Sequence, residues 1–190
     1  MISLRPLTYR IGLLLGLGQP ELAAAAEEQW QIAPAEFRRV PPVIILPGQA
    51  ERVTRAEFTT LPLLMQSLHG DPAEPIGPTT AYRLADVDIV DGVVYSHGYT
   101  LHLRQRRHRM SLGHLESIPA GAAYESWVGN RWFGNWLLDD CLTYRLAEQA
   151  GTPVTTMPPR GGHVPDYEFR LGMHPRRITD AHFDELVVFD

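Results

Sequence analysis

Residues 131–157 read RWFGNWLLDDCLTYRLAEQAGTPVTTM and point to an α/β fold. Leu138, Leu142 and Leu146 recur every four residues, the spacing that places side chains on one face of a helix. The residues at 137, 141 and 144 flank these leucines and widen the apolar stripe. The segment therefore predicts a long helix over residues 131–150 with one buried face.

Residues suited to helix ends bound this segment on both sides. Asn130 is favourable as an N-cap, Gly151 as the first residue after the helix, and Pro153 prevents its continuation. The apolar residues 154–157 then predict a strand. A helix followed by a strand favours an α/β half-domain with a partly parallel sheet.

The segment VDIVDGVVY, residues 87–95, predicts a β-hairpin upstream of that half-domain. Asp91 and Gly92 supply the positive φ angles that a two-residue type I′ turn requires. Residues 99–103 alternate between apolar and polar side chains and predict a third strand. We therefore expect an antiparallel region before the parallel one.

Weaker signals predict the remaining elements. The loop-forming residues 69–80, rich in Gly and Pro, mark the best internal boundary. The strand expected at the last residues suggests that the sequence continues in its natural context. The other expected helices lie at residues 20–30, 61–68 and 166–171, and the other strands at 43–46, 122–128 and 186–189.

Composition narrows the class of protein. The chain has 190 residues and a net charge of −5, with 44% hydrophobic and 21% charged residues, as in one ordinary globular domain. Its acidic balance argues against a dedicated nucleic-acid binder. Every one of its 17 basic residues is Arg, so Walker-A phosphate binding and Schiff-base chemistry are excluded. Cys141 is the only cysteine, which excludes a disulfide within the chain and a multi-cysteine zinc site.

The amino terminus has the outline of a signal peptide. Arg5 and Arg10 precede an apolar run at residues 11–17, and alanines follow at 23–25. That run is at the lower length limit, and the alanines continue into charged residues, which favours the helix at 20–30 instead. No segment approaches the roughly 20 apolar residues that span a bilayer. We expect a cytoplasmic protein, with a shallow, peripheral membrane contact through residues 11–17 as an alternative.

Residues 101–109, LHLRQRRHR, form the densest basic run. It fits the solvent face and turn of an antiparallel sheet, or else a site for a polyanionic substrate or an acidic partner. The nearby histidines at 97, 102, 108 and 114 are five or six residues apart, whereas ligands on one helix usually lie three or four apart. No metal site is expected.

Two neighbouring acids in the predicted helix are candidate functional residues. Asp139 and Asp140 point about 100 degrees apart on a helix, so one can be solvated while the other is held in the interior. Asn135 lies four residues before Asp139 and shares its face. His163 follows the strand at 154–157, and ligands of open α/β sheets bind at the carboxyl ends of strands.

The segment FGNWLLD, residues 133–139, resembles the aromatic-Gly-His-Trp-Leu-Leu-Asp motif that opens a helix in glycosyltransferase family 61, the capsular polysaccharide biosynthesis type. Residues 146–154, with the turn and strand that follow the helix, are similar as well. So are residues 42–53, the Asp-Gly hairpin, and residues 169–173 with the strand at 186–189. The resemblance covers about residues 40–190.

The resemblance implies an inverting, metal-independent transferase of hexosyl or pentosyl groups. Its GT-B architecture has two Rossmann-like halves, and the amino half faces the glycan acceptor. We therefore expect a helical leader at 1–39 and an acceptor-side domain at 40–190, with the donor-binding half missing. A nucleotide sugar serves as co-substrate, and no cofactor is implied.

The resemblance also suggests roles for single residues. Asp139 is the expected catalytic base, with His163 as the second choice, and Asn135, Trp136 and Asp140 are expected to bind substrate. Asn135 stands where the family has histidine, and an amide cannot accept a proton at useful pH.

Two other interpretations stay open. The chain is alternatively a non-catalytic glycan- or partner-binding module, acting as a homo-oligomer or beside a partner subunit. The third interpretation is a polyanion- or metal-binding protein that uses residues 101–114.

Overall fold

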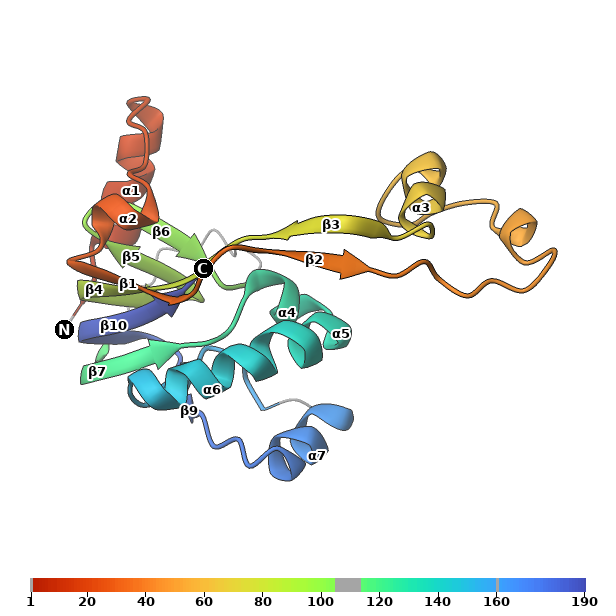
Figure 1. Ribbon diagram of the computed structural model, residues 1–190. Coiled ribbons are helices and arrows are strands. Elements are labelled where there is room, and N and C mark those ends of the chain that lie inside the picture. The colour runs from red at the N-terminus through yellow and green to blue at the C-terminus, as the bar shows by residue number, and fades with distance from the viewer. Residues whose placement is uncertain (1, 105–113, 160) are drawn as a thin grey trace. The chain divides into compact units, whose positions relative to one another are not determined.

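The computed structural model describes residues 2–104, 114–159 and 161–190, in two compact units (Figure 1). The first unit comprises Met1–Trp30 and Thr80–Asp190, and the second comprises Gln31–Thr79. Of the basic run at 101–109, residues 105–109 lie outside the described residues.

One mixed sheet organises the first unit. Its strand order is β6-β5-β4-β10-β7-β8-β9, and β1 pairs with β4 at the side. The strands are β1 (Glu28–Ala33), β4 (Thr79–Val90), β5 (Val93–Ser96), β6 (Tyr99–His102), β7 (Glu116–Ala123), β8 (Pro153–Thr155), β9 (Arg176–Arg177) and β10 (Ala181–Phe189).

Four neighbouring strands of this sheet are parallel. β10 pairs with β7, β7 with β8, and β8 with β9, each in parallel. The chain runs from β7 outward to β9 and then returns to the other side of β7 with β10. The strand order therefore reverses between β7 and β10, as at the switch point of doubly wound sheets. The expected α/β class and partly parallel sheet are confirmed.

The antiparallel strands lie on the other side of β10. β4 pairs with β10 and β5, and β5 pairs with β6, each antiparallel. Asp91 and Gly92 join β4 to β5 with φ angles of 48° and 73°, which confirms the predicted turn chemistry. The third strand at 99–103 is confirmed as β6.

The sequence from residue 127 to 150 forms a series of helical segments rather than one helix from 131. They are α4 (Trp127–Arg131), α5 (Phe133–Asn135), a π-helical turn (Trp136–Asp140) and α6 (Cys141–Ala150). Ser126 caps α4, because its side chain accepts from the N–H of Gly129. The predicted cap Asn130 was wrong: its amide donates instead to Glu125 and to the carbonyl of Leu103.

Each face of the sheet carries its own core. On one face, Tyr144 and Ala147 of α6 pack with Trp136 against strand residues such as Val187, and α6 runs along the sheet in Figure 1. On the other face, α2 (Leu22–Ala25) packs against a cluster that includes Phe183. The remaining helices of this unit are α1 (Arg5–Leu14) and α7 (His163–Arg170).

A paired irregularity crosses β4 and β10. Leu84 and Val87 are three residues apart, yet both belong to the same buried cluster, although strand residues on one face are normally two apart. Between them Asp86 has a φ of 50°, in the left-handed region that few non-glycine residues adopt. β4 and β10 keep the same pairing register on both sides of this irregularity. The positions that face the buried cluster therefore shift by one residue along both strands at this point.

Three other predictions differ from the structure. The helix at 20–30 is limited to α2, and β1 begins at Glu28, because its backbone pairs with β4. The strand at 43–46 was wrong: these apolar residues are exposed and irregular. The loop at 69–80 contains β3, which pairs with β2 despite its two prolines.

The remaining expectations hold with shifted ends. The helix at 61–68 is α3 (Leu61–Ser67), and the helix at 166–171 begins earlier, as α7. Of the strand expected at 122–128, only the start belongs to β7, and α4 begins at Trp127. The strand at 154–157 is β8, and that at 186–189 is the end of β10.

The second unit is a two-stranded ribbon with a helical tip region. β2 (Glu36–Val40) and β3 (Asp71–Ile76) pair antiparallel, and a short 3-10 turn (Ala50–Arg52) and α3 follow β2 along the chain. All of β2 is exposed, and large apolar side chains such as Phe37, Ile44 and Phe58 face solvent. This unit has little interior of its own.

Candidate functional site

The carboxyl ends of β7 and β8 are joined by a buried acid. Glu125 follows β7, and its carboxylate accepts from the amide of Asn130 at 2.9 Å and the hydroxyl of Thr155 at 2.8 Å. It also accepts from the backbone N–H of Thr156 at 2.7 Å. Glu125 is 6% exposed, so these bonds compensate its burial. Sequence reasoning missed Glu125, and its only signal is a lone acid directly after an apolar strand.

Asp140 is held in the interior beside this turn. One carboxylate oxygen accepts from the backbone N–H and the hydroxyl of Ser126, at 3.1 and 2.8 Å. The other oxygen has no hydrogen-bond partner among the described residues. Burial raises the pKa of Asp140 to about 7, against the lowering effect of the Ser126 bonds. Its contacts are those of a group that positions the β7–α4 turn.

Asp139 lies on the outer side of the same π-helical turn. It is exposed, and the Asn135 amide donates to its carboxylate at 3.2 Å. The predicted shared face of Asn135 and Asp139 is confirmed, and so is the predicted divergence of Asp139 and Asp140. π-helical turns are frequent at functional sites, so this turn is a candidate position for function.

Aromatic side chains cluster around Phe133, in the helical segment that carries that polar pair. The ring centroid of Phe133 is 5.9 Å from that of His163 and 5.5 Å from that of Tyr167, both on α7. Phe133 and Tyr167 are each 36% exposed, and His163 is exposed. The structure therefore brings His163 to the helical segment that carries Asn135, which the sequence did not predict. We call Phe133, Asn135, Asp139, His163 and Tyr167 the aromatic-polar surface.

Trp136 occupies the inner side of Phe133. Their rings stack at 5.7 Å between centroids, and Trp136 is fully buried. Its ring packs against the inner face of Phe133 and offers no face to a bound molecule in this conformation.

The helix that carries His163 is fixed to the sheet by an arginine. Arg177, at the end of β9, donates to both carboxylate oxygens of Glu168 on α7, at 2.8 and 2.7 Å. The same guanidinium donates to the carbonyl of Met157 after β8. One guanidinium nitrogen thus binds the Glu168 carboxylate while another binds the Met157 carbonyl, so Arg177 ties α7, which carries His163, to the sheet.

Further aromatic side chains precede this surface on α4. The Arg131 guanidinium lies over the rings of Trp127 and Trp132, at 5.3 and 4.6 Å from their centroids. The two indoles meet edge to face at 5.7 Å. Both indoles therefore make cation–π contacts with the same guanidinium, and the Trp127 ring is partly exposed.

A separate polar cluster links β4, β10 and the amino terminus. His182 Nδ1 lies 2.8 Å from the carboxylate of Asp88, its cross-strand neighbour. Ser3 donates to the other Asp88 oxygen, and Arg5 Nε lies 3.3 Å from it. Sequence reasoning missed this cluster, because its members come together only through the register of β4 and β10.

The described residues contain no group of three His, Cys, Asp or Glu side chains that could hold a metal ion. The β7–α4 turn also carries no glycine-rich phosphate cradle.

In the comparisons with known proteins, no family model, curated protein or solved structure matches the chain. The fold and the site define a mixed α/β protein with an exposed aromatic-polar surface beside its parallel strands.

Proposed function

We propose that the chain is the acceptor-binding half of a glycosyltransferase similar to family 61. The observation that carries the proposal is the aromatic-polar surface: the exposed Phe133 ring, packed against Tyr167, and the hydrogen-bonded Asn135–Asp139 pair belong to the same helical segment. The order of the four parallel strands reverses between β7 and β10, as in one Rossmann-like half. This reversal supports the GT-B assignment.

This surface suits the chemistry of a sugar. A pyranose ring has an apolar face of C–H groups and a rim of hydroxyls. Phe133 and Tyr167 offer flat apolar area at a small cost in side-chain entropy. Asn135 both donates and accepts, and Asp139 accepts from sugar hydroxyls.

In the proposed reaction, Asp139 takes the proton of an acceptor hydroxyl as its oxygen attacks the anomeric carbon of a nucleotide sugar. The new C–O bond forms as the bond to the nucleoside diphosphate breaks, and the anomeric centre inverts. A carboxylate base works best when it is partly desolvated. Because Asp139 is exposed in this chain, the donor half would have to cover it.

A second candidate is a glycan-binding module without transferase activity. The observation that favours it is Asn135, whose amide cannot replace a histidine base. Binding without turnover is the outcome that separates this candidate from the first.

The test of glycan binding is a titration of the protein with neutral hexasaccharides of glucose, xylose and mannose, followed by calorimetry. Phe133→Ala should weaken binding about three- to tenfold, the loss expected for one aromatic contact. Phe169→Ala is the matched control, because Phe169 lies on α7, is 82% exposed and is outside the surface. Equal affinities of both variants and the wild type would remove the aromatic-polar surface from glycan binding.

The test of transfer uses the transferase with both halves present, incubated with radiolabelled UDP- and GDP-sugars and whichever hexasaccharide binds. If Asp139 is the base, Asp139→Asn abolishes label incorporation while the affinity for the hexasaccharide stays within about threefold of wild type. Incorporation at an unchanged rate in that variant would remove Asp139 from the reaction.

A further inference from the structure

The end of α1 and the turn after it form an apolar projection. Large aliphatic side chains are exposed at five of seven consecutive positions, with Leu14 87% and Leu15 71% exposed. Solvent-exposed apolar clusters of this density mark interaction sites. We call residues 11–17 the apolar tip; its exposed members are Ile11, Leu13, Leu14, Leu15 and Leu17.

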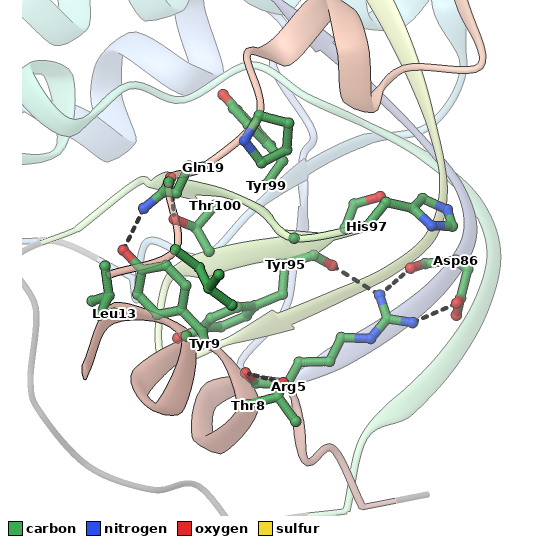
Figure 2. Close-up of a pocket in the computed structure, with 16 residues that line it drawn as sticks. Arg5, Thr8, Tyr9, Leu13, Gln19, Asp86, Tyr95, His97, Tyr99 and Thr100 are labelled. Atoms are coloured by element: carbon green, nitrogen blue, oxygen red, sulfur yellow. Dashed lines mark hydrogen bonds and ion pairs between the residues drawn. The ribbon is translucent and has the colours of Figure 1, made fainter. Parts of the chain in front are cut away.

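The apolar tip does not pack into the core of the first unit. A cavity of about 630 Å³ lies between the segment and strands β5 and β6, and Leu13 and Leu17 line it. Figure 2 shows α1 and the following turn on one side of this cavity and the strands on the other. The apolar tip therefore has solvent outside it and a cavity behind it.

The base of the segment is held firmly to the sheet. Arg5 forms an ion pair with Asp86 and donates to the carbonyl of Tyr95 at 3.0 Å (Figure 2). Tyr9 meets the Tyr95 ring edge to face at 6.0 Å. After the tip, Gln19 accepts from the Thr100 hydroxyl at 2.9 Å. The tip is consequently presented between two fixed points.

The charge of this segment complements an anionic surface. Residues 1–20 contain no Asp or Glu, although the whole chain has a net charge of −5. Of the two arginines in this stretch, Arg5 is paired with Asp86, so Arg10 is the cation beside the tip. Arg10 directly precedes the apolar tip. Basic residues next to exposed aliphatic ones are typical of segments that lie in the interface of a lipid leaflet.

We propose that the apolar tip inserts into the interfacial layer of one leaflet of an anionic lipid bilayer. Its exposed large side chains are aliphatic and cannot form hydrogen bonds, and leucine is under-represented among the hot spots of protein interfaces. None of the described helices is long and apolar enough to cross a membrane. The contact is therefore peripheral, and it goes beyond the proposed glycosyl transfer.

The test is flotation with vesicles of phosphatidylcholine alone or mixed with phosphatidylglycerol. The wild type should bind the mixed vesicles, and Leu14→Asp/Leu15→Asp should bind them at least tenfold more weakly, because each Asp replaces a membrane-buried aliphatic group. Ile44→Asp is the matched control, since Ile44 is 95% exposed in the second unit. Its binding should equal that of the wild type. Circular dichroism checks that all three proteins fold alike.

Three outcomes overturn the proposal. The first is a wild type that binds neither kind of vesicle, and the second is equal binding by the double variant. The third is sedimentation of the wild type as a dimer that the double variant abolishes without vesicle binding, since a second copy then covers the tip. None of these readouts depends on sugar transfer, so they leave the proposed function to its own tests.

Discussion

At the scale of single residues, Asp140 couples the pH of the solution to the stability of the fold. Burial raises its pKa from the ordinary 3.8 to about 7. At pH values between these two pKa values, Asp140 is ionised in the unfolded chain but keeps its proton in the folded protein. The stability that this group contributes is therefore complete below about pH 4 and is lost as the pH rises to about 7.

Asp140→Asn should remove this dependence, because an amide does not ionise and its oxygen can still accept from Ser126. From pH 5 to pH 8 the wild type should lose about 2 to 3 kcal/mol of unfolding free energy more than the variant, as expected for about two pKa units. Urea denaturation at both pH values measures the difference. The control is Asp139→Asn, one residue away and exposed, which should retain most of the wild-type dependence. An equal loss in wild type and Asp140→Asn would contradict the assignment.

At the scale of elements, the segmented helix depends on close packing between α4 and the π-helical turn. A Cβ added to Gly129 of α4 would collide with the Asp140 carboxyl. The absence of a side chain at this position therefore lets the two segments approach and bury Asp140.

Two glycine substitutions should separate this packing effect from helix propensity. Gly129→Ala should lower the unfolding free energy by about 1 to 3 kcal/mol, the cost of overpacking a filled interior. Gly134→Ala should raise it by about 0.5 to 1 kcal/mol, because its Cβ meets nothing within 4 Å and alanine favours helix. Thermal or urea unfolding reports both. A Gly129→Ala variant at least as stable as the wild type would show that Asp140 does not constrain Gly129.

Elements whose signals are local could be predicted from the sequence. The turn at Asp91 and Gly92 depends on the φ preference of those two residues. The helical periodicity predicted that residues 137–150 form helix, but the buried stripe centred on Leu138 and Leu142 was wrong. These leucines are 68% and 69% exposed, and α6 instead buries Cys141, Tyr144 and Ala147, because those residues face the sheet. The predicted cap at Asn130 was wrong because its amide bonds to Glu125 and Leu103, contacts that exist only once β7 is in place.

The candidate site was predictable to a similar extent. The shared face of Asn135 and Asp139 follows from their spacing of four. The approach of Phe133 to His163 and Tyr167 depends on how α7 docks, which Arg177 and Glu168 determine across β9. The bond between Asp88 and His182 joins residues 94 apart and exists only through strand register.

At the scale of the whole molecule, stability is unevenly divided between the two units. The buried hydrophobic clusters that the structure describes lie wholly in the first unit. The second unit is built on one two-stranded ribbon, and such ribbons are marginally stable without further packing.

The first unit should consequently fold without the second. Replacing residues 34–78 by a short flexible Gly/Ser linker keeps β1 and β4 intact. The shortened protein should give a dispersed amide NMR spectrum and one cooperative unfolding transition, because its clusters lose no member. A matched control with the same linker replacing residues 124–152 removes Trp136 and α6 from the core, and it should not fold. A shortened protein that unfolds without cooperativity would show that the ribbon stabilises the sheet, and the two units would then have to be treated as one folding domain.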